Sequence, residues 1–398
     1  MHRLLLALAL TALAAAPARA QDPRLDSLAA EIRALRAKLD SLRARLDTTK
    51  HDTVDALASL RARARTQAQA GDTAPAARAG GERNLNQLNP EISVTSDLRG
   101  FVQTDGPQRD NVELFELEFS FQATLDPYSH TKIFAGLHGD EIEVEEAYFY
   151  YTGLPGRLRL DLGVFRQQLG ELNRWHLHAV PEIGYPLALT TYTGEEGLVG
   201  TGLSAYLARS ILGTQELWIQ GVLGDNAGLF DGGNRPAGLV HLNNFWNVGS
   251  SSFFQFGVTG MYGQNPDSAL KTTLGGVDLR FTWRPPARAK YREWTVRAEL
   301  LGVDKERAGS GDARYGLFVG TQYKLGSRWW VGARYDYVEA PEGPLGIVRQ
   351  VVPSLTFWQS EWVRLHGEYR WRREAGTTTS QVALQAVWAI GPHKHETY

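Results

Sequence analysis

Between residues 91 and 390 one pattern restricts the fold more than any other feature: apolar and polar residues alternate one by one along many short segments. In residues 115–122 Phe and Leu alternate with Glu, Ser and Gln, and residues 157–164 and 363–372 follow the same rule. Because successive side chains of a β-strand point to opposite faces, this pattern predicts strands with one apolar and one charged face. A single such strand would suit a soluble sandwich equally well, so the number and length of the strands are decisive.

Sixteen strand candidates follow one another along the chain. They lie at residues 92–103, 113–125, 129–138, 143–152, 157–167, 198–208, 215–224, 238–248, 252–263, 272–284, 291–303, 313–325, 328–338, 346–358, 361–373 and 379–390. The eighth is weak, but tight and long connections alternate only if a strand crosses between residues 237 and 249. An even count also returns the C-terminus to the periplasmic side. We therefore predict an all-β transmembrane barrel of about 16 antiparallel strands, with 14 or 18 as alternatives.

Composition agrees with a barrel. After residue 20 no stretch approaches the ~18 apolar residues of a transmembrane helix, although 43% of the residues are hydrophobic. A membrane protein without such helices crosses as a closed barrel, and 41 glycines with 10% aromatic residues suit its strands. The net charge of −2 gives no reason to expect nucleic acid as a partner, and the absence of cysteine excludes thiolate chemistry.

The first 87 residues are organised differently. Residues 1–20 have a basic start, an apolar run and an Ala-Arg-Ala ending, which are typical of a secretory signal peptide. Residues 21–65 carry Leu and Ile at alternating intervals of three and four residues, which predicts a periplasmic α-helical coiled coil. An amphipathic helix on the barrel rim or the membrane surface is the alternative. Residues 66–87 are interpreted as a flexible linker, 88–390 as the barrel and 391–398 as a periplasmic tail.

This organisation predicts a location and partners. The barrel is expected in the outer membrane of a Gram-negative-type envelope, in contact with outer-membrane lipid, with the coiled coil in the periplasm. Residues 25–46 are the candidate contact of a homotrimer. A helix of about 40 residues spans roughly 60 Å, so peptidoglycan or another periplasmic partner is within reach.

The charged side of the strands is expected to face the barrel interior. The residues that this places in or near the lumen are Arg157, Arg159, Arg280, Arg297, Arg334, Arg364, Arg370, Glu116, Glu118, Asp161, Asp336 and Glu368. Two interpretations stay open: the charges select solutes, or they pair with one another and fill the barrel. The longest connection, residues 168–197, is expected to fold inward as a constriction, with an exposed external cap as the alternative.

Evidence for a metal site or for catalysis is weak. The connection 168–197 contains His176 and His178, with Glu182 nearby, and imidazoles with carboxylates are zinc ligands. Because no third and fourth ligand has a defined spacing, local hydrogen bonding is the preferred interpretation of these histidines. We predict no cofactor. The sequence contains no nucleophile elbow, no zinc-protease motif and no phosphate-binding glycine loop, so it does not favour an enzyme.

Several short stretches resemble one group of outer-membrane proteins. They are LNPEISV at 88–94, EFSFQ at 118–122, VEEAY at 144–148, GEEGL at 194–198 and GPH at 391–393. Over residues 88–398 the chain is thus similar to phosphate-selective-porin-like barrels, some of which are labelled zinc-regulated TonB-dependent outer-membrane receptors. The resemblance implies a porin, because such a receptor has 22 strands and a plug domain, which roughly 300 residues cannot build.

The predicted function is therefore a porin-like channel. We expect passive diffusion of small hydrophilic solutes or ions through a charged lumen narrowed by residues 168–197. The alternative is a non-conducting barrel that anchors the envelope or captures a ligand or a metal such as zinc.

Overall fold

The computed structural model describes residue 38 and residues 90–105, 110–139, 141–224, 228–230, 235–265, 270–307, 313–342 and 346–391. The predicted signal peptide, coiled coil and linker lie outside the described residues, apart from Lys38, and so does the tail, apart from Gly391. The chain divides into two compact units, residues 1–81 and 82–398, and the second contains the strands.

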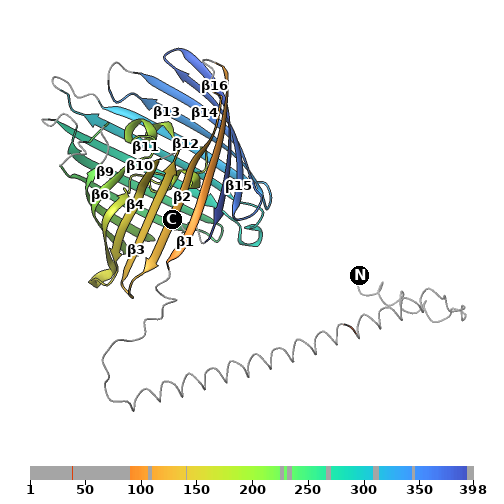
Figure 1. Ribbon diagram of the computed structural model, residues 1–398. Helices are drawn as coiled ribbons and strands as arrows, with labels where there is room; N and C mark the ends of the chain where they lie inside the picture. Colours follow the sequence, from red (N-terminus) through yellow and green to blue (C-terminus); the bar gives the residue numbers. More distant parts are fainter. Residues whose placement is uncertain are drawn as a thin grey trace, which may run out of the picture. The chain divides into compact units, whose positions relative to one another are not determined.

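The second unit is a barrel of sixteen strands (Figure 1). They are β1 (Glu91–Asp105), β2 (Asn111–Thr124), β3 (Ser129–His138), β4 (Glu141–Tyr151), β5 (Leu158–Arg166), β6 (Val199–Arg209), β7 (Thr214–Gly224), β8 (Ala237–Val248), β9 (Ser252–Gln264), β10 (Lys271–Trp283), β11 (Trp294–Lys305), β12 (Arg314–Lys324), β13 (Trp329–Glu339), β14 (Ile347–Trp358), β15 (Val363–Glu374) and β16 (Thr377–Ile390).

Each strand pairs antiparallel with its neighbours in sequence, and β1 pairs with β16 to close the barrel. Val94 near the start of β1 lies opposite Ile390 at the end of β16, so the two ends of the described barrel meet at the same rim. Closure gives every strand two partners, as a barrel in lipid requires. The prediction of sixteen strands is confirmed, and so is β8, which pairs with both β7 and β9.

The alternation in the sequence corresponds to the two faces of the barrel wall. In β15 the side chains of Arg364, His366 and Glu368 are buried, whereas Leu365 and Tyr369 between and beside them are 46% and 41% exposed. Large apolar side chains occupy outward positions on most other strands as well. The polar face of the wall therefore lies toward the interior and the apolar face lies outside, as in membrane barrels.

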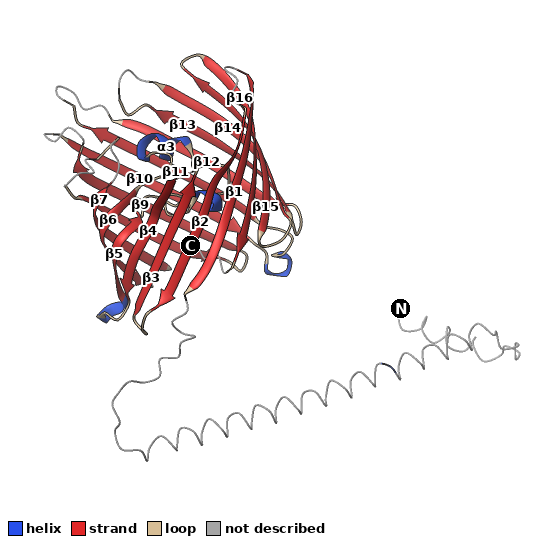
Figure 2. Cartoon of the chain, in the orientation of Figure 1, coloured by secondary structure: helices blue, strands red, loops and turns tan. Residues whose placement is uncertain are grey.

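Among the described residues, no helix combines the length and the hydropathy needed to cross a membrane. The helices between residues 90 and 391 that the structure describes are short: η2 (Pro155–Arg157), η3 (Leu177–Ala179), α3 (Leu187–Thr193) and η4 (Pro286–Arg288). The helices η3 and α3 belong to residues 167–198, which connect β5 to β6 and which we call the inner loop. Figure 2 shows α3 among the strands, and it packs against β12 and β13.

A hydrophobic core fills part of the barrel interior. Leu172, Leu189 and Tyr192 of the inner loop belong to one buried cluster with wall residues such as Leu274 and Leu301, and each is at most 2% exposed. Burial of this apolar surface favours the inward position of the inner loop. The interior is thus partly apolar, which the alternation of charged and apolar residues did not predict.

Candidate functional site

The inner loop is held together at its neck by one side chain. Asn173 Nδ2 donates to the carbonyl oxygens of Gln167 and Leu198 at 2.8 and 2.9 Å, and its Oδ1 accepts from the Leu198 N–H at 2.6 Å. One buried amide therefore holds the two ends of the inner loop together where the chain leaves the barrel wall and returns to it. The predicted inward course of residues 168–197 is what the structure shows.

One carboxylate, Glu171, joins the inner loop to β10 and β11. Its Oε1 lies 3.0 Å from Arg280 Nη1 and 3.3 Å from Arg297 Nε. The preceding residue, Gly170, has φ of 57°, and a Cβ there would lie 2.3 Å from a carboxylate oxygen of Glu299 on β11. Glycine is therefore required for this close approach of loop and wall.

A second attachment joins the inner loop to β13 and β15. Glu182 Oε2 lies 3.2 Å from Arg334 Nη1, and the Ile183 N–H donates to Glu368 Oε2 at 3.0 Å. Arg364 donates to two further backbone carbonyls of the inner loop. The loop thus crosses the interior rather than lining one side of it.

The third attachment is a group of carboxylates and histidines, which we call the His–Glu cluster: Glu116, Glu118, Glu145, His176 and His178. His176 Nδ1 lies 2.6 Å from Glu118 Oε2 and 3.0 Å from Glu145 Oε2. His178 Nδ1 lies 3.2 Å from Glu116 Oε2 and 3.9 Å from Glu118 Oε2. All five side chains are buried.

The electrostatics of this cluster favour a charged imidazole. Burial alone would lower the pKa of His176, but the carboxylates of Glu118 and Glu145 outweigh burial and raise the pKa well above its ordinary value. In the same loop, burial raises the pKa of Tyr185, whose hydroxyl stays protonated and donates a hydrogen bond to the Trp175 carbonyl oxygen.

A β-bulge in β4 places Glu145 in the cluster. Phe134 on β3 pairs with Glu146, and the next residue, Ala135, pairs with Val144, so Glu145 is the extra residue. As a result Glu145 and Glu146 are both buried at 5% and 8% exposure, although consecutive strand residues normally face opposite sides.

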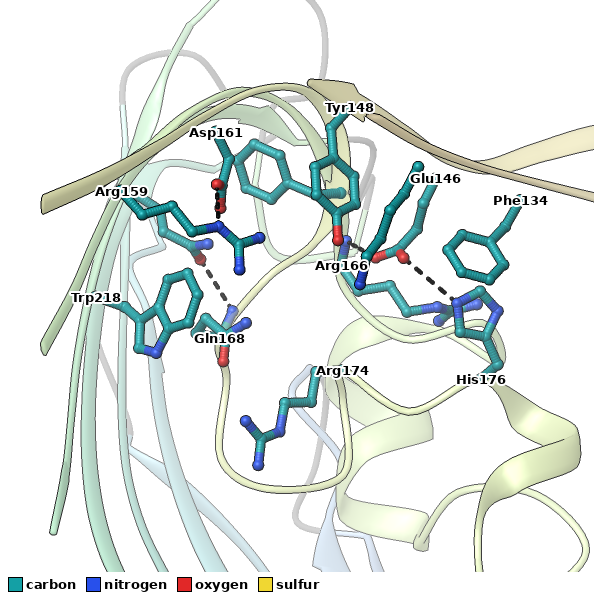
Figure 3. Close-up of a pocket in the computed structure, with 13 residues that line it drawn as sticks. Phe134, Glu146, Tyr148, Arg159, Asp161, Arg166, Gln168, Arg174, His176 and Trp218 are labelled. Carbon is teal, nitrogen blue, oxygen red and sulfur yellow. Dashed lines mark hydrogen bonds and ion pairs between the residues drawn. The ribbon is translucent and has the colours of Figure 1, made fainter. Parts of the chain in front are cut away.

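A polar cavity lies between the inner loop and the wall of β3 to β7, beside the His–Glu cluster (Figure 3). Its volume is ≈ 30 Å³, which is room for about two water molecules. Among the described residues that line it, basic side chains outnumber carboxylates: Lys132, Arg159, Arg166 and Arg174 against Glu146 and Asp161. The cavity is therefore narrow and has an excess of positive charge.

Arg174 differs from the other basic residues of this lining. Its buried Nε and Nη2 atoms have no hydrogen-bond partner within the described part of the chain. Figure 3 shows its guanidinium apart from the paired groups, whereas Arg159 lies 2.6 Å from Asp161 and Arg166 lies 2.6 Å from Glu145. Arg174 thus has buried donors that none of the described residues uses.

The structure places the sequence-predicted lumen residues as follows. Buried or half-buried toward the barrel interior are Arg159, Arg280, Arg297, Arg334, Arg364, Arg370, Glu116, Glu118, Asp161, Asp336 and Glu368. Several pair along one strand: Arg334 lies 3.0 Å from Asp336, and Arg370 lies 2.6 Å from Glu368. Of the three candidate metal ligands, His176 and His178 come together, whereas Glu182 lies with Arg334 instead.

The structure corrects the prediction made for Arg157. It was expected on the charged face of a strand beginning at residue 157, but it lies in η2, before β5 begins at Leu158, and it is exposed. Its φ of 62°, after Gly156 with φ of 74°, belongs to a tight turn. The Pro-Gly sequence of that turn displaces Arg157 from the strand.

Sequence reasoning missed Asn173, Glu171, Arg174 and Glu145. The first three lie in the inner loop, where no periodicity indicates which side chain faces the wall. For Glu145 a signal existed, because Glu145-Glu146 interrupts the alternation of β4 and so indicates a bulge.

Sequence comparisons identify a distant relative of the chain but no family. No family model matches the chain. It is 22% identical over 322 residues to an uncharacterized protein of Aquifex aeolicus (strain VF5), and this alignment covers 69% of the chain and 68% of the relative.

Solved structures of outer-membrane porins share the fold. OprB of Pseudomonas putida has a TM-score of 0.57 at 11% identity and covers 78% of this chain and 97% of its own. The anion-selective porin of Comamonas acidovorans has a TM-score of 0.54 at 10% identity, covering 76% and 100%. The trimer form of Vibrio cholerae OmpT has a TM-score of 0.52 at 11% identity, covering 76% and 100%. The chain therefore has the closed sixteen-stranded antiparallel barrel of outer-membrane porins.

Proposed function

We propose that this barrel is a porin-like outer-membrane channel through which small hydrophilic solutes or ions diffuse passively, past the inner loop. The observation that carries the proposal is the polar cavity between the inner loop and β3 to β7. At this part of the loop–wall boundary charged side chains, rather than the hydrophobic core, line the space. Polar groups around a narrow space are what a hydrated solute requires.

The charge of the lining supports a preference for anions. Four basic residues face two carboxylates among the described residues of the lining, and Arg174 has unpaired donors there. Because a cavity of ≈ 30 Å³ holds about two water molecules, we expect low conductance and exclusion of large solutes. The role is passive, and no catalytic step is proposed.

The surroundings of the channel are part of the proposal. The exposed apolar side chains of the outer wall suit contact with outer-membrane lipid. Residues 21–65 would form a periplasmic coiled coil after removal of the signal peptide, with residues 25–46 joining three chains. That coiled coil would also reach peptidoglycan or another periplasmic partner.

Single-channel recording of the refolded protein in a planar bilayer with a salt gradient tests the proposal. We expect small discrete conductance steps and a reversal potential of the sign that indicates anion preference. A protein whose heat-modifiable electrophoretic mobility shows that it is folded, but which gives no conductance steps, would contradict the channel. That result would favour the anchoring or capture role.

A further inference from the structure

We propose that the His–Glu cluster binds a divalent transition-metal cation between the inner loop and the wall. The donors form two overlapping sets of three, Glu118 with Glu145 and His176, and Glu118 with Glu116 and His178, and within each set the ligand atoms lie within 4.8 Å of one another. They come from β2, β4 and the inner loop, and Glu118 belongs to both sets. Imidazole nitrogens together with carboxylate oxygens suit Zn²⁺ and similar ions better than Mg²⁺ or Ca²⁺. This inference concerns binding, and it stands whether or not the barrel conducts.

The distances between the donor atoms fit such an ion. Tetrahedral zinc with bonds of about 2.0 Å separates its ligand atoms by roughly 3.3 Å. From Glu118 Oε2 the Nδ1 atoms of His176 and His178 lie at 2.6 and 3.9 Å, and Glu145 Oε2 lies 3.0 Å from His176 Nδ1. The distances from His176 to Glu118 and Glu145 thus depart from the required spacing by about 0.7 and 0.3 Å, and a small shift of these side chains would bring the three donors onto one ion.

Glu118 provides an independent indication of a ligand. Its side chain has 0% exposure, and Oε1 accepts no hydrogen bond from the described residues. Its ion-pair partners in the described part of the chain are the two imidazoles of the cluster. A buried carboxylate oxygen without a donor is unfavourable unless a further group approaches it, and a cation bound by the same cluster is such a group.

The groups around the cluster have the arrangement that orients metal ligands. His176 presents Nδ1 to the cluster, while its Nε2 lies 3.4 Å from Glu146 Oε2, so that a second carboxylate fixes the ring. Arg166 Nη2, 2.6 Å from Glu145 Oε2, orients that carboxylate in turn. Only the bulge in β4 places Glu145 and Glu146 on the same side, so the strand departs from regular pairing at the residues that would serve the site.

Zinc binding by the refolded full-length protein is the direct test. The protein is stripped with chelator and dialysed against Zn²⁺, and the bound metal is measured by mass spectrometry; Co²⁺ in parallel gives visible absorption that reports nitrogen and oxygen donors. We expect one ion per chain. The substitutions E118Q and H176Q should each weaken binding more than ~100-fold, and E146Q by roughly 10- to 100-fold, the effect expected of an outer-shell carboxylate.

His241→Gln is the matched control. His241 is also a buried interior histidine, but its Nδ1 lies 2.8 Å from the Thr259 hydroxyl and outside the cluster, so zinc binding should be unchanged. Heat-modifiable mobility shows that each variant folds, and H178Q serves as a further ligand variant if H176Q does not. The site would be overturned if the unaltered protein did not bind zinc, or if E118Q and H178Q bound zinc as tightly as the unaltered protein does. The cluster would then be only an ion-paired attachment of the loop.

Discussion

Glu182 of the inner loop lies 3.2 Å from Arg334 of β13, and the two side chains are only 5% and 2% exposed. Arg334 also lies 3.0 Å from Asp336 on the same strand, so one guanidinium serves a loop carboxylate and a wall carboxylate. His176 attaches the loop elsewhere, to β2 and β4. The inner loop is thus fixed to separate parts of the wall, and the width of the space beside it depends on these attachments.

Replacing Glu182 by Gln should loosen the loop at β13. Arg334 keeps Asp336, so the loss is that of one charged hydrogen bond, about 1.5–3 kcal/mol of the free energy of unfolding. We expect a lower thermal unfolding temperature in detergent and a larger, less steady single-channel conductance.

Glu342→Gln is the control for that substitution. Glu342 pairs with Lys305 but its side chain is 59% exposed, so the change should cost less than about 1 kcal/mol and leave conductance as it is. If both variants behave alike, the buried attachment does not set the width of the channel.

Replacing Arg174 by Gln should reduce the preference for anions. A unit charge about 4 Å from a passing ion contributes about 1 kcal/mol even in water-like surroundings, which corresponds to roughly a fivefold change in permeability ratio. Reversal potentials in a salt gradient measure it. The exposed Arg209 at the barrel end is the matched control, because charges more than about 10 Å away are largely screened at 0.1 M salt. An unchanged reversal potential in R174Q would show that Arg174 does not contribute to the ion selectivity.

The strands were predictable because their signal is local. Leu365 outside and His366 inside are decided by a period of two that the sequence itself displays. Even the weak strand β8 followed from counting connections, since an antiparallel barrel needs an even number of strands to return its end to the same rim.

The interior of the barrel was predictable only in part. Arg280 and Arg297 were expected toward the interior and are half-buried, but their common partner Glu171 lies in a connection without periodicity, more than 100 residues earlier in the chain. Its position depends on the path of the whole inner loop, which packing and the Asn173 hydrogen bonds determine. No spacing in the sequence encodes those long-range contacts.

Gly163 in β5 tests how closely the wall is packed. Its φ is 138°, and a Cβ there would lie 2.2 Å from the Ala147 carbonyl oxygen of β4. Gly163→Ala should therefore destabilise the barrel by about 1–3 kcal/mol through backbone strain and displacement. Thermal unfolding followed by electrophoretic mobility measures the effect. Gly260→Ala on β9, where an added Cβ meets nothing within 4 Å, should unfold like the unaltered protein. An equal loss of stability in both variants would show that the exchange of glycine for alanine in a strand, and not the close contact at Gly163, is responsible.

Deleting residues 22–80 tests the proposed trimer contact and the proposed periplasmic partner. The strands close on themselves within residues 91–390, so the ladder of the described strands is complete without the deleted segment, and conductance per barrel should persist. If residues 25–46 join three chains, light scattering in detergent should show the mass falling to that of one chain, and co-sedimentation with peptidoglycan should be lost.

Leu35→Lys with Leu39→Lys in the full chain is the sharper version of that deletion, since it keeps the length of the segment and removes only its apolar seam. A charge at two successive seam positions is incompatible with a packed coiled coil, so these substitutions should reproduce the loss of the trimer. A trimer that survives both changes would mean that the outer wall of the barrel, and not the N-terminal segment, holds the chains together.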